Sequence, residues 1–152
     1  MDIQIYGTKF TNKNTFGDFD FMCNNSVYNN SLFIFNDNEE HHNSCNAGGG
    51  NAIIRKYNKY NKTITKPKSA GIPTGTLRLG GYDDLIEEVV LFIDNSIQEI
   101  RELIIKYNYD TLYYSVGSNN KLGTGIFNVS PNVINYIDKQ IHNLSNKPVI
   151  YI

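Results

Sequence analysis

Residues 32–35, Leu-Phe-Ile-Phe, form a continuous apolar run with polar residues on both sides. Because successive side chains of a strand point to opposite faces, this run predicts a strand that is buried on both faces. A central strand of an α/β sheet has this environment, since helices cover both sides of such a sheet. The segment therefore constrains the fold more strongly than any other part of the chain.

Further strands and helices are predicted to alternate around this segment. Short runs rich in β-branched and aromatic residues predict strands at residues 3–6, 70–73, 111–116 and 148–152. Apolar residues at helical spacing predict helices over residues 51–57, over 96–107 and from Pro131 onward. Strands that alternate with helices in this way are typical of a layered α/β domain.

The boundaries of the long helix are drawn from its capping residues. Asp94 or Ser96 is the expected N-cap, and Glu99 lies three residues after Ser96 as in a capping box. Residues 83–93 fit either a strand or an earlier helical turn. Four aromatic residues are expected in the core: Phe33, Phe35, Phe92 and Tyr113.

The length of 152 residues suits a single domain, and the charges limit the function classes. Fourteen Lys and Arg residues stand against 15 Asp and Glu, so the net charge is −1 and offers no general attraction for nucleic acid or anionic lipid. The basic residues 55–68 with Tyr57 and Tyr60 are the one candidate surface for nucleic acid. A solvated basic loop is the favoured interpretation, and no nucleic-acid partner is expected.

The location is predicted to be cytoplasmic. The sequence opens without a basic segment followed by an apolar one, and no apolar run approaches the roughly 18 residues of a membrane span. Cys23 and Cys45 are too few for a disulfide framework, which fits a reducing compartment. Asn, Ile, Lys and Tyr are abundant, and their AT-rich codons suggest a viral or protozoan genome.

Two glycine-rich loops carry the functional prediction. Gly48, Gly49 and Gly50 precede the helix of residues 51–57, and a second loop ending at Gly125 follows the strand of residues 111–116. Glycine lets a backbone approach a ligand closely, and free amides at a helix start favour phosphate. Either loop alone could be a simple turn, but two in one small domain favour a diphosphate site. Neither loop has the Walker A or the dinucleotide-fingerprint spacing.

The run Gly123-Thr124-Gly125-Ile126-Phe127 resembles the second phosphate loop of macro domains, which bind ADP-ribose. Gly17-Asp18-Phe19, residues 32–38 and the three glycines resemble other motifs of that family in the same order, and residues 72–74 are similar to its viral and phage members. The resemblance covers most of the chain from Gly17 onward. It implies one domain over residues 1–152, built as a three-layer α/β/α sandwich with a central mixed sheet.

The resemblance also implies roles for individual residues. Asp18 would bind the adenine amino group and the backbone of Phe19 would place the ring, while Asn38 and Phe127 would contact the distal ribose. Amides of the two loops would hold the diphosphate. The implied ligand-binding residues are Asp18, Phe19, Asn36, Asn38, Gly48, Gly49, Gly50, Gly123, Thr124, Gly125, Ile126 and Phe127. Asn38 is also the catalytic candidate, and neither a cofactor nor a metal is expected.

Departures from the family pattern bear on catalysis more than on binding. The acidic residue that follows the glycines in one hydrolytic branch is replaced here by Asn51-Ala52, the Glu pair of the poly-ADP-ribose-cleaving branch is missing, and residues 118–122 look like an insertion. The interval between Asn38 and Gly48 is longer than usual. It contains groups that could activate water if the loop covered the ligand, although a solvated loop is the favoured interpretation: Asp37, Glu39, Glu40 and His41. Adjacent side chains diverge, so His41 and His42 are not expected to share a metal.

Three functions stay open from the sequence. The chain is predicted to bind ADP-ribose, an ADP-ribosylated protein or a related NAD-derived nucleotide. The first alternative is a hydrolase that removes ADP-ribose from proteins or processes ADP-ribose phosphates. The second alternative is an interaction protein whose glycines only form turns. The sequence indicates no membrane partner.

Overall fold

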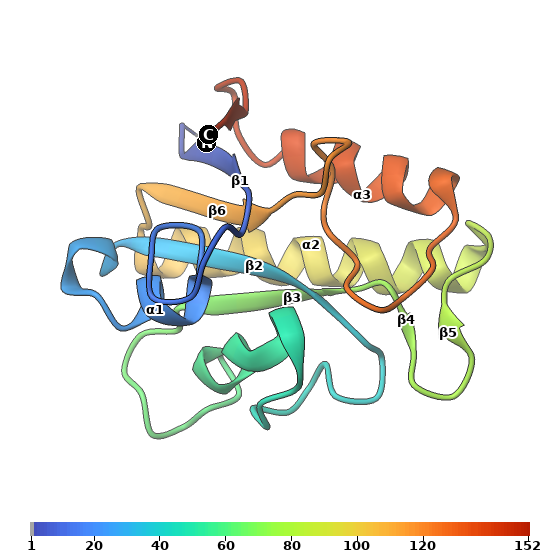
Figure 1. Cartoon of the computed structure of the whole chain (residues 1–152), viewed down its shortest axis with the longest axis horizontal. Helices are drawn as coiled ribbons and strands as arrows, with labels where there is room; N and C mark the ends of the chain where they lie inside the picture. The colour runs from blue at the N-terminus through green and yellow to red at the C-terminus, as the bar shows by residue number, and fades with distance from the viewer. Residues whose placement is uncertain (1) are drawn as a thin grey trace.

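The computed structural model describes residues 2–152 as an α/β fold with a parallel central sheet (Figure 1). The strands are β1 (Gln4–Thr8), β2 (Ser31–Asp37), β3 (Ser69–Pro73), β4 (Gly75–Thr76), β5 (Gly80–Gly81), β6 (Thr111–Ser115) and β7 (Ile150–Tyr151). The helices are α1 (Phe19–Cys23), α2 (Glu87–Tyr107) and α3 (Pro131–His142), with the 3₁₀ helices η1 (Ser26–Tyr28) and η2 (Gly50–Tyr57). The predicted alternation of strands and helices is confirmed.

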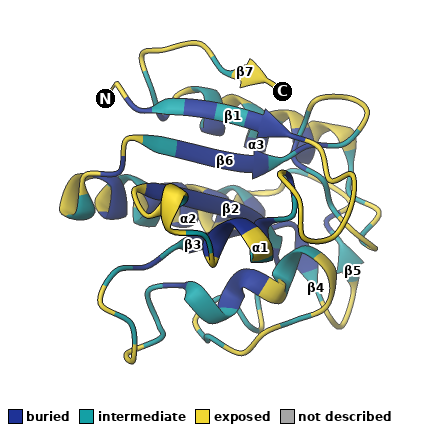
Figure 2. Cartoon of the chain, turned by 60° about the vertical axis from the view of Figure 1, so that its left-hand side comes forward, coloured by how far each residue is buried: buried dark blue, intermediate teal, exposed yellow. Residues whose placement is uncertain are grey.

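The central sheet has five strands in the order β3-β2-β6-β1-β7. Every neighbouring pair in it is parallel, and the antiparallel pair β4–β5 forms a separate two-stranded ribbon. The expected mixed sheet is therefore a parallel one. Figure 2 shows β2, β6 and β1 largely buried in the middle, whereas β7 lies exposed at one edge.

One face of the sheet packs against α2 and α3. Leu32 and Ile34 of β2 point to this side and belong to the larger hydrophobic core, together with Ile93, Ile100 and Ile137 from the two helices. All five side chains are fully buried. The apolar stripe predicted for α3 is confirmed, and its Pro131 stands at the first helical position as expected.

The other face is covered by α1, η1 and η2. Phe33 and Phe35 alternate with Leu32 and Ile34 along β2, so their side chains point to this second face. There they belong to a second hydrophobic core that also contains Phe19 and Tyr113. Phe33 stacks on Tyr113 with ring centroids 5.2 Å apart. The prediction that residues 32–35 form a strand buried on both faces is confirmed.

Helix α2 begins at Glu87, so the helical alternative left open for residues 83–93 holds from residue 87 onward, and the expected N-cap at Asp94 or Ser96 is wrong. Residues 87–95 are helical, and Ser96 is a buried mid-helix residue whose hydroxyl donates to the Phe92 carbonyl at 2.9 Å, so it is no N-cap. The helix ends at Tyr107, and its C-cap Asn108 adopts the left-handed conformation at φ 54°. Phe92, expected in the core, is 40% exposed because Ile93 takes the inward position beside it. Among residues 2–152, no helix has the length and apolar character that crossing a bilayer requires.

The register of α2 can be tested with neighbouring substitutions. Ile93→Ala should lower the free energy of unfolding by about 2–5 kcal/mol, since it leaves a cavity in a packed core. Phe92→Ala, one residue away on the exposed side, should cost about 1 kcal/mol or less. Urea denaturation of both variants measures the difference, and equal losses would contradict this register.

Candidate functional site

The two glycine loops leave the sheet at the same edge because β2 and β6 are parallel neighbours. Their pairing aligns Ile34 with Tyr114, so both chains run out of the sheet in the same direction. The loop after β2 leads to Gly48 and η2, and the loop after β6 leads to Thr124. Ligands of α/β sheets bind at this carboxyl edge, which makes the region between the loops the candidate site.

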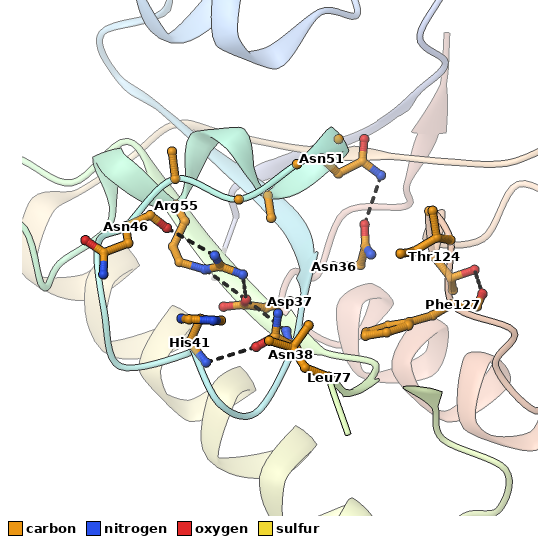
Figure 3. A pocket seen from close by; sticks show the side chains of 17 residues that line it. Asn36, Asp37, Asn38, His41, Asn46, Asn51, Arg55, Leu77, Thr124 and Phe127 are labelled. Atoms are coloured by element: carbon orange, nitrogen blue, oxygen red, sulfur yellow. Dashed lines mark hydrogen bonds and ion pairs between the residues drawn. The ribbon is translucent and has the colours of Figure 1, made fainter. Parts of the chain in front are cut away.

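Both loops line one cavity of about 430 Å³ (Figure 3). One wall consists of the end of β2, the loop after it and η2, and the opposite wall carries Thr124 and Phe127. The lining residues are Asn36, Asp37, Asn38, His41, Asn46, Ala47, Gly48, Gly49, Gly50, Asn51, Ala52, Arg55, Leu77, Thr124, Gly125, Ile126 and Phe127. The predicted convergence of the two loops is thus present in the structure.

Two hydrogen-bonded asparagines, Asn36 and Asn51, lie beside the second glycine loop. The Asn51 side chain on η2 donates to Asn36 Oδ1 on β2 at 2.9 Å (Figure 3). A Cβ built on Gly125 would lie 3.6 Å from Asn36 Nδ2, and one on Gly123 would lie 3.9 Å from Asn51 Nδ2. Both are ordinary contact distances, so the second loop packs directly beside the asparagine pair.

Several backbone amides of the cavity have no partner. Within residues 2–152, the amides of Gly49, Gly50 and Gly125 donate no hydrogen bond. Gly50 and Gly125 have φ angles of 57° and 62°, a conformation that glycine adopts without strain. Unpaired amides at the start of a helix and in a glycine turn are donors for an anionic oxygen.

A second cavity of about 540 Å³ adjoins the first, and Gly50 and Asn51 line both. Its walls include Asp18 and Phe19 from the start of α1 and Phe35 from β2. Asp18 accepts the Asn14 amide at Oδ2, 2.8 Å away. The structure thus brings Asp18 and Phe19 beside the first glycine loop, in a chamber with aromatic and carboxylate groups.

A buried ion pair stands under the first cavity. Asp37, at the end of β2, accepts hydrogen bonds from Arg55 of η2 at Oδ1, 3.0 Å from Nε and 2.5 Å from Nη2. The Arg55 and Asp37 side chains are 2% and 1% exposed, so water screens this pair little. Arg55 Nη1 also donates to the Asn46 carbonyl at 3.1 Å, which fixes the far end of the loop over residues 38–47.

The ion pair continues as a chain of alternating charges. His42 Nδ1 lies 3.4 Å from Asp37 Oδ2, and His42 Nε2 lies 2.9 Å from Glu99 Oε1 on α2. Glu99 Oε2 in turn contacts Lys59 Nζ at 3.3 Å and the Tyr60 hydroxyl at 3.1 Å.

The neighbouring charges set the protonation states of His42, Asp37 and Glu99. Burial by itself lowers the pKa of His42, but the hydrogen bond to Glu99 and the charges of Glu99 and Asp37 outweigh it and raise this pKa to about 9. Burial likewise opposes ionisation of Asp37 and Glu99, yet the nearby His42, together with Arg55 beside Asp37 and Lys59 beside Glu99, holds the pKa of each carboxyl below its usual value. His42 is therefore a cation at neutral pH.

Asp37 requires glycine on the neighbouring strand. A Cβ built on Gly71 of β3 would lie 2.5 Å from Asp37 Oδ2 and 2.8 Å from Asp37 Cβ. The carboxylate fills the space that a side chain at position 71 would occupy.

The other polar groups of the loop have different tasks. Glu39 accepts the Tyr82 hydroxyl at 2.6 Å and Glu40 accepts the Leu77 amide at 2.9 Å, so both carboxylates tie the loop to the segment around the β4–β5 ribbon. Asn38 Oδ1 accepts the His41 amide at 2.9 Å. Of the acid–base candidates, His41 alone both lines the cavity and has no side-chain bond within residues 2–152.

The adjacent histidines diverge as expected. His41 lines the cavity, whereas His42 turns toward Asp37 and Glu99. In the described range 2–152, no group of three or more His, Cys, Asp or Glu side chains is arranged to hold a metal ion.

Three lysines of the basic segment 55–68 have local partners. Lys56 pairs with Asp20 at 3.2 Å, and Lys59 pairs with Glu99. Lys68 Nζ lies 5.6 Å from the centroid of the Tyr57 ring and donates to the Cys23 carbonyl. These lysines have nearby carboxylate, ring or carbonyl partners, as in a folded basic loop.

Most predicted site residues surround the two adjoining cavities. Gly123 does not line either of them; its amide donates to the Ser115 carbonyl at 2.9 Å and extends the end of β6. The sequence analysis missed Asn51, Arg55 and the His42–Glu99 contact. Arg55 lies on the predicted helix after the glycines, but its pairing with Asp37 depends on how η2 packs on β2.

Comparisons of the chain with models of protein families, with curated proteins and with solved structures found no match.

The buried pair can be tested against an exposed neighbour. Arg55→Met should lower the free energy of unfolding by about 3–5 kcal/mol, because it leaves Asp37 buried with only part of its compensation. Lys56→Met removes the exposed pair with Asp20 and should cost less than about 1 kcal/mol. Chemical denaturation at pH 7 compares the two, and a small loss for Arg55→Met would contradict a buried charge at Asp37.

Proposed function

We propose that this protein binds ADP-ribose or a closely related NAD-derived nucleotide. The observation that carries the proposal is the convergence of Gly49 and Thr124, from two separate loops, on one cavity. Unpaired amides on both sides suit a diphosphate, which has anionic oxygens on each phosphorus. This agrees with the resemblance to macro domains, because these two loops are the segments that resemble the phosphate loops of that family.

The adjoining cavity supports a ligand with a base at one end. Asp18 uses Oδ2 for the Asn14 amide, and Oδ1 has no partner among the described residues, so it can accept an exocyclic amino group. Phe19 and Phe35 supply aromatic surface for a purine. The ribose beyond the diphosphate would then lie in the first cavity near Asn36, Asn38 and Phe127.

The fold is part of the same proposal. Helices α2 and α3 on one face and α1 and η2 on the other are compatible with a macro-domain-like three-layer sandwich. The binding partner would be free ADP-ribose or an ADP-ribosylated protein, and the compartment the cytoplasm.

Binding is tested by titration calorimetry with ADP-ribose, AMP and adenosine. Affinity should fall in that order as phosphates are removed, and ADP-ribose at 100 times its dissociation constant should stabilise the fold by about 2.7 kcal/mol. Asp18→Ala should weaken ADP-ribose about tenfold but leave ribose 5-phosphate unaffected, since only the adenine contact is lost. The matched control is Asp84→Ala, a fully exposed carboxylate outside both cavities.

A null result has a defined meaning. If millimolar ADP-ribose neither binds nor raises the melting temperature, the nucleotide proposal fails. The interaction-protein alternative, in which the glycines serve only as turns, then stands.

The hydrolase is the second candidate, and His41 favours it. This imidazole lines the cavity next to Asn38 with no side-chain bond in the described chain, so it is available to move a proton. Asp37 is occupied by Arg55, while Glu39 and Glu40 hold the β4–β5 region.

Hydrolysis is tested with mono-ADP-ribosylated protein and with ADP-ribose 1″-phosphate. If the protein is a hydrolase, His41→Gln should reduce kcat about 100-fold with little change in KM, and Asn38→Ala should reduce release of ADP-ribose. Binding of ADP-ribose to His41→Gln serves as the control for folding. Absence of turnover by the wild type would reject the hydrolase and leave binding untouched.

A further inference from the structure

The loop over residues 38–47 forms one wall of the first cavity, and His42 anchors it from behind. The His42 side chain is only 11% exposed and stands between two carboxylates on different elements, Asp37 of β2 and Glu99 of α2. The ring nitrogens lie 3.4 Å from Asp37 Oδ2 and 2.9 Å from Glu99 Oε1. His42 thus joins the loop to the sheet and to the helix at once.

This bridge requires the imidazolium form. A neutral imidazole has one N–H and one lone pair, so one of the two carboxylates would face a lone pair. Both carboxylates are held in their charged form by their partners, and a carboxylate that faces a lone pair has lost both the donor and the positive charge beside it. Loss of the proton therefore breaks one side of the bridge.

The effect reaches the cavity through Asp37. Its other oxygen accepts two hydrogen bonds from Arg55, which also donates to the carbonyl of Asn46. Asp37, Arg55 and Asn46 all line the first cavity. A shift of Asp37 would therefore move both ends of the loop wall, at Asn38 and at Asn46.

We propose that His42 is a positioning residue: by bridging Asp37 and Glu99 as a cation, it holds residues 38–47 in the ligand-binding arrangement, so that ligand affinity follows its charge. The inference rests on the proposed function, since it takes the cavity between the glycine loops as the ligand site. His42 itself does not line that cavity, so it would act on a ligand only through the loop wall.

The pH range follows from the groups around the ring. His42 faces Asp37 and Glu99, with Arg55, Lys59 and Tyr60 beyond them. The pKa of His42 is raised to about 9 and that of Tyr60 to about 12, while both carboxyl pKa values are lowered. Because the folded-state pKa of His42 exceeds its unfolded value, its contribution is complete below about pH 6.5 and is lost as the pH rises through 9.

Calorimetry with ADP-ribose from pH 7 to 10 tests the inference. Wild-type affinity should fall about tenfold with a midpoint near pH 9, which lies within the usual range of coupling between sites. His42→Gln should bind about tenfold more weakly at pH 7 and show no further loss up to pH 10. His142→Gln, which changes a histidine at the end of α3, should keep the wild-type affinity and profile.

A second variant covers the case in which His42→Gln does not fold. Glu99→Gln removes one of the two carboxylates that raise the pKa of His42, so the midpoint of the affinity profile should move below pH 9. A wild-type affinity that is constant from pH 7 to 10, or a Glu99→Gln midpoint identical to that of the wild type, would overturn the inference.

A ligand-free measurement separates this inference from the proposed function. The Arg55 Nε–H resonance in a ¹⁵N spectrum should shift with a midpoint near pH 9, and Glu99→Gln should lower that midpoint. If ADP-ribose does not bind, the proposed function is rejected, and the Arg55 resonance still decides whether His42 controls the cavity wall. An Arg55 resonance that does not titrate rejects the positioning role.

Discussion

The parallel pairing of β2 with β6 is the constraint on which the site depends. Parallel neighbours end at the same edge, so Gly49 and Thr124, which are 75 positions apart in sequence, meet across one cavity. An antiparallel pairing of the same two strands would place those loops at opposite edges. The pairing in turn needs helices on both faces, since the inner strands expose apolar side chains to each side.

The chain of charges from Arg55 to Glu99 explains how a polar loop becomes part of a rigid wall. Removing charges from water is costly. A buried ion pair stabilises a fold only when its geometry is good and further hydrogen bonds satisfy the remaining donors and acceptors. Here each charged side chain lies beside one of opposite charge, and the series of ion pairs connects η2, β2, the loop over residues 38–47 and α2. The loop is ordered by these contacts in place of apolar packing, which makes its geometry sensitive to a single proton.

The sequence predicted what depends on local pattern. Residues 32–35 identified the inner strand β2, because four consecutive apolar side chains between polar residues are typical of a strand buried on both faces. The glycine loops were identified by their positions between strands and helices. The start of α2 was misplaced because Ser96 has the residue type of an N-cap, while its actual bond to the Phe92 carbonyl depends on the helix continuing through it. Partners such as Arg55 with Asp37 and His42 with Glu99 are non-local, and no spacing in the sequence encodes them.

The close approach of β3 to Asp37 carries an evolutionary consequence. Where Gly71 stands, even a methyl group would collide with the carboxylate. A relative with a larger residue at the position of Gly71 is expected to lack the carboxylate at the position of Asp37, which is the counter-ion of Arg55. Positions 71 and 37 are therefore expected to change together in relatives that lack the buried ion pair. The presence of both Gly71 and Asp37 would therefore distinguish relatives that keep the buried ion pair from relatives that have replaced it.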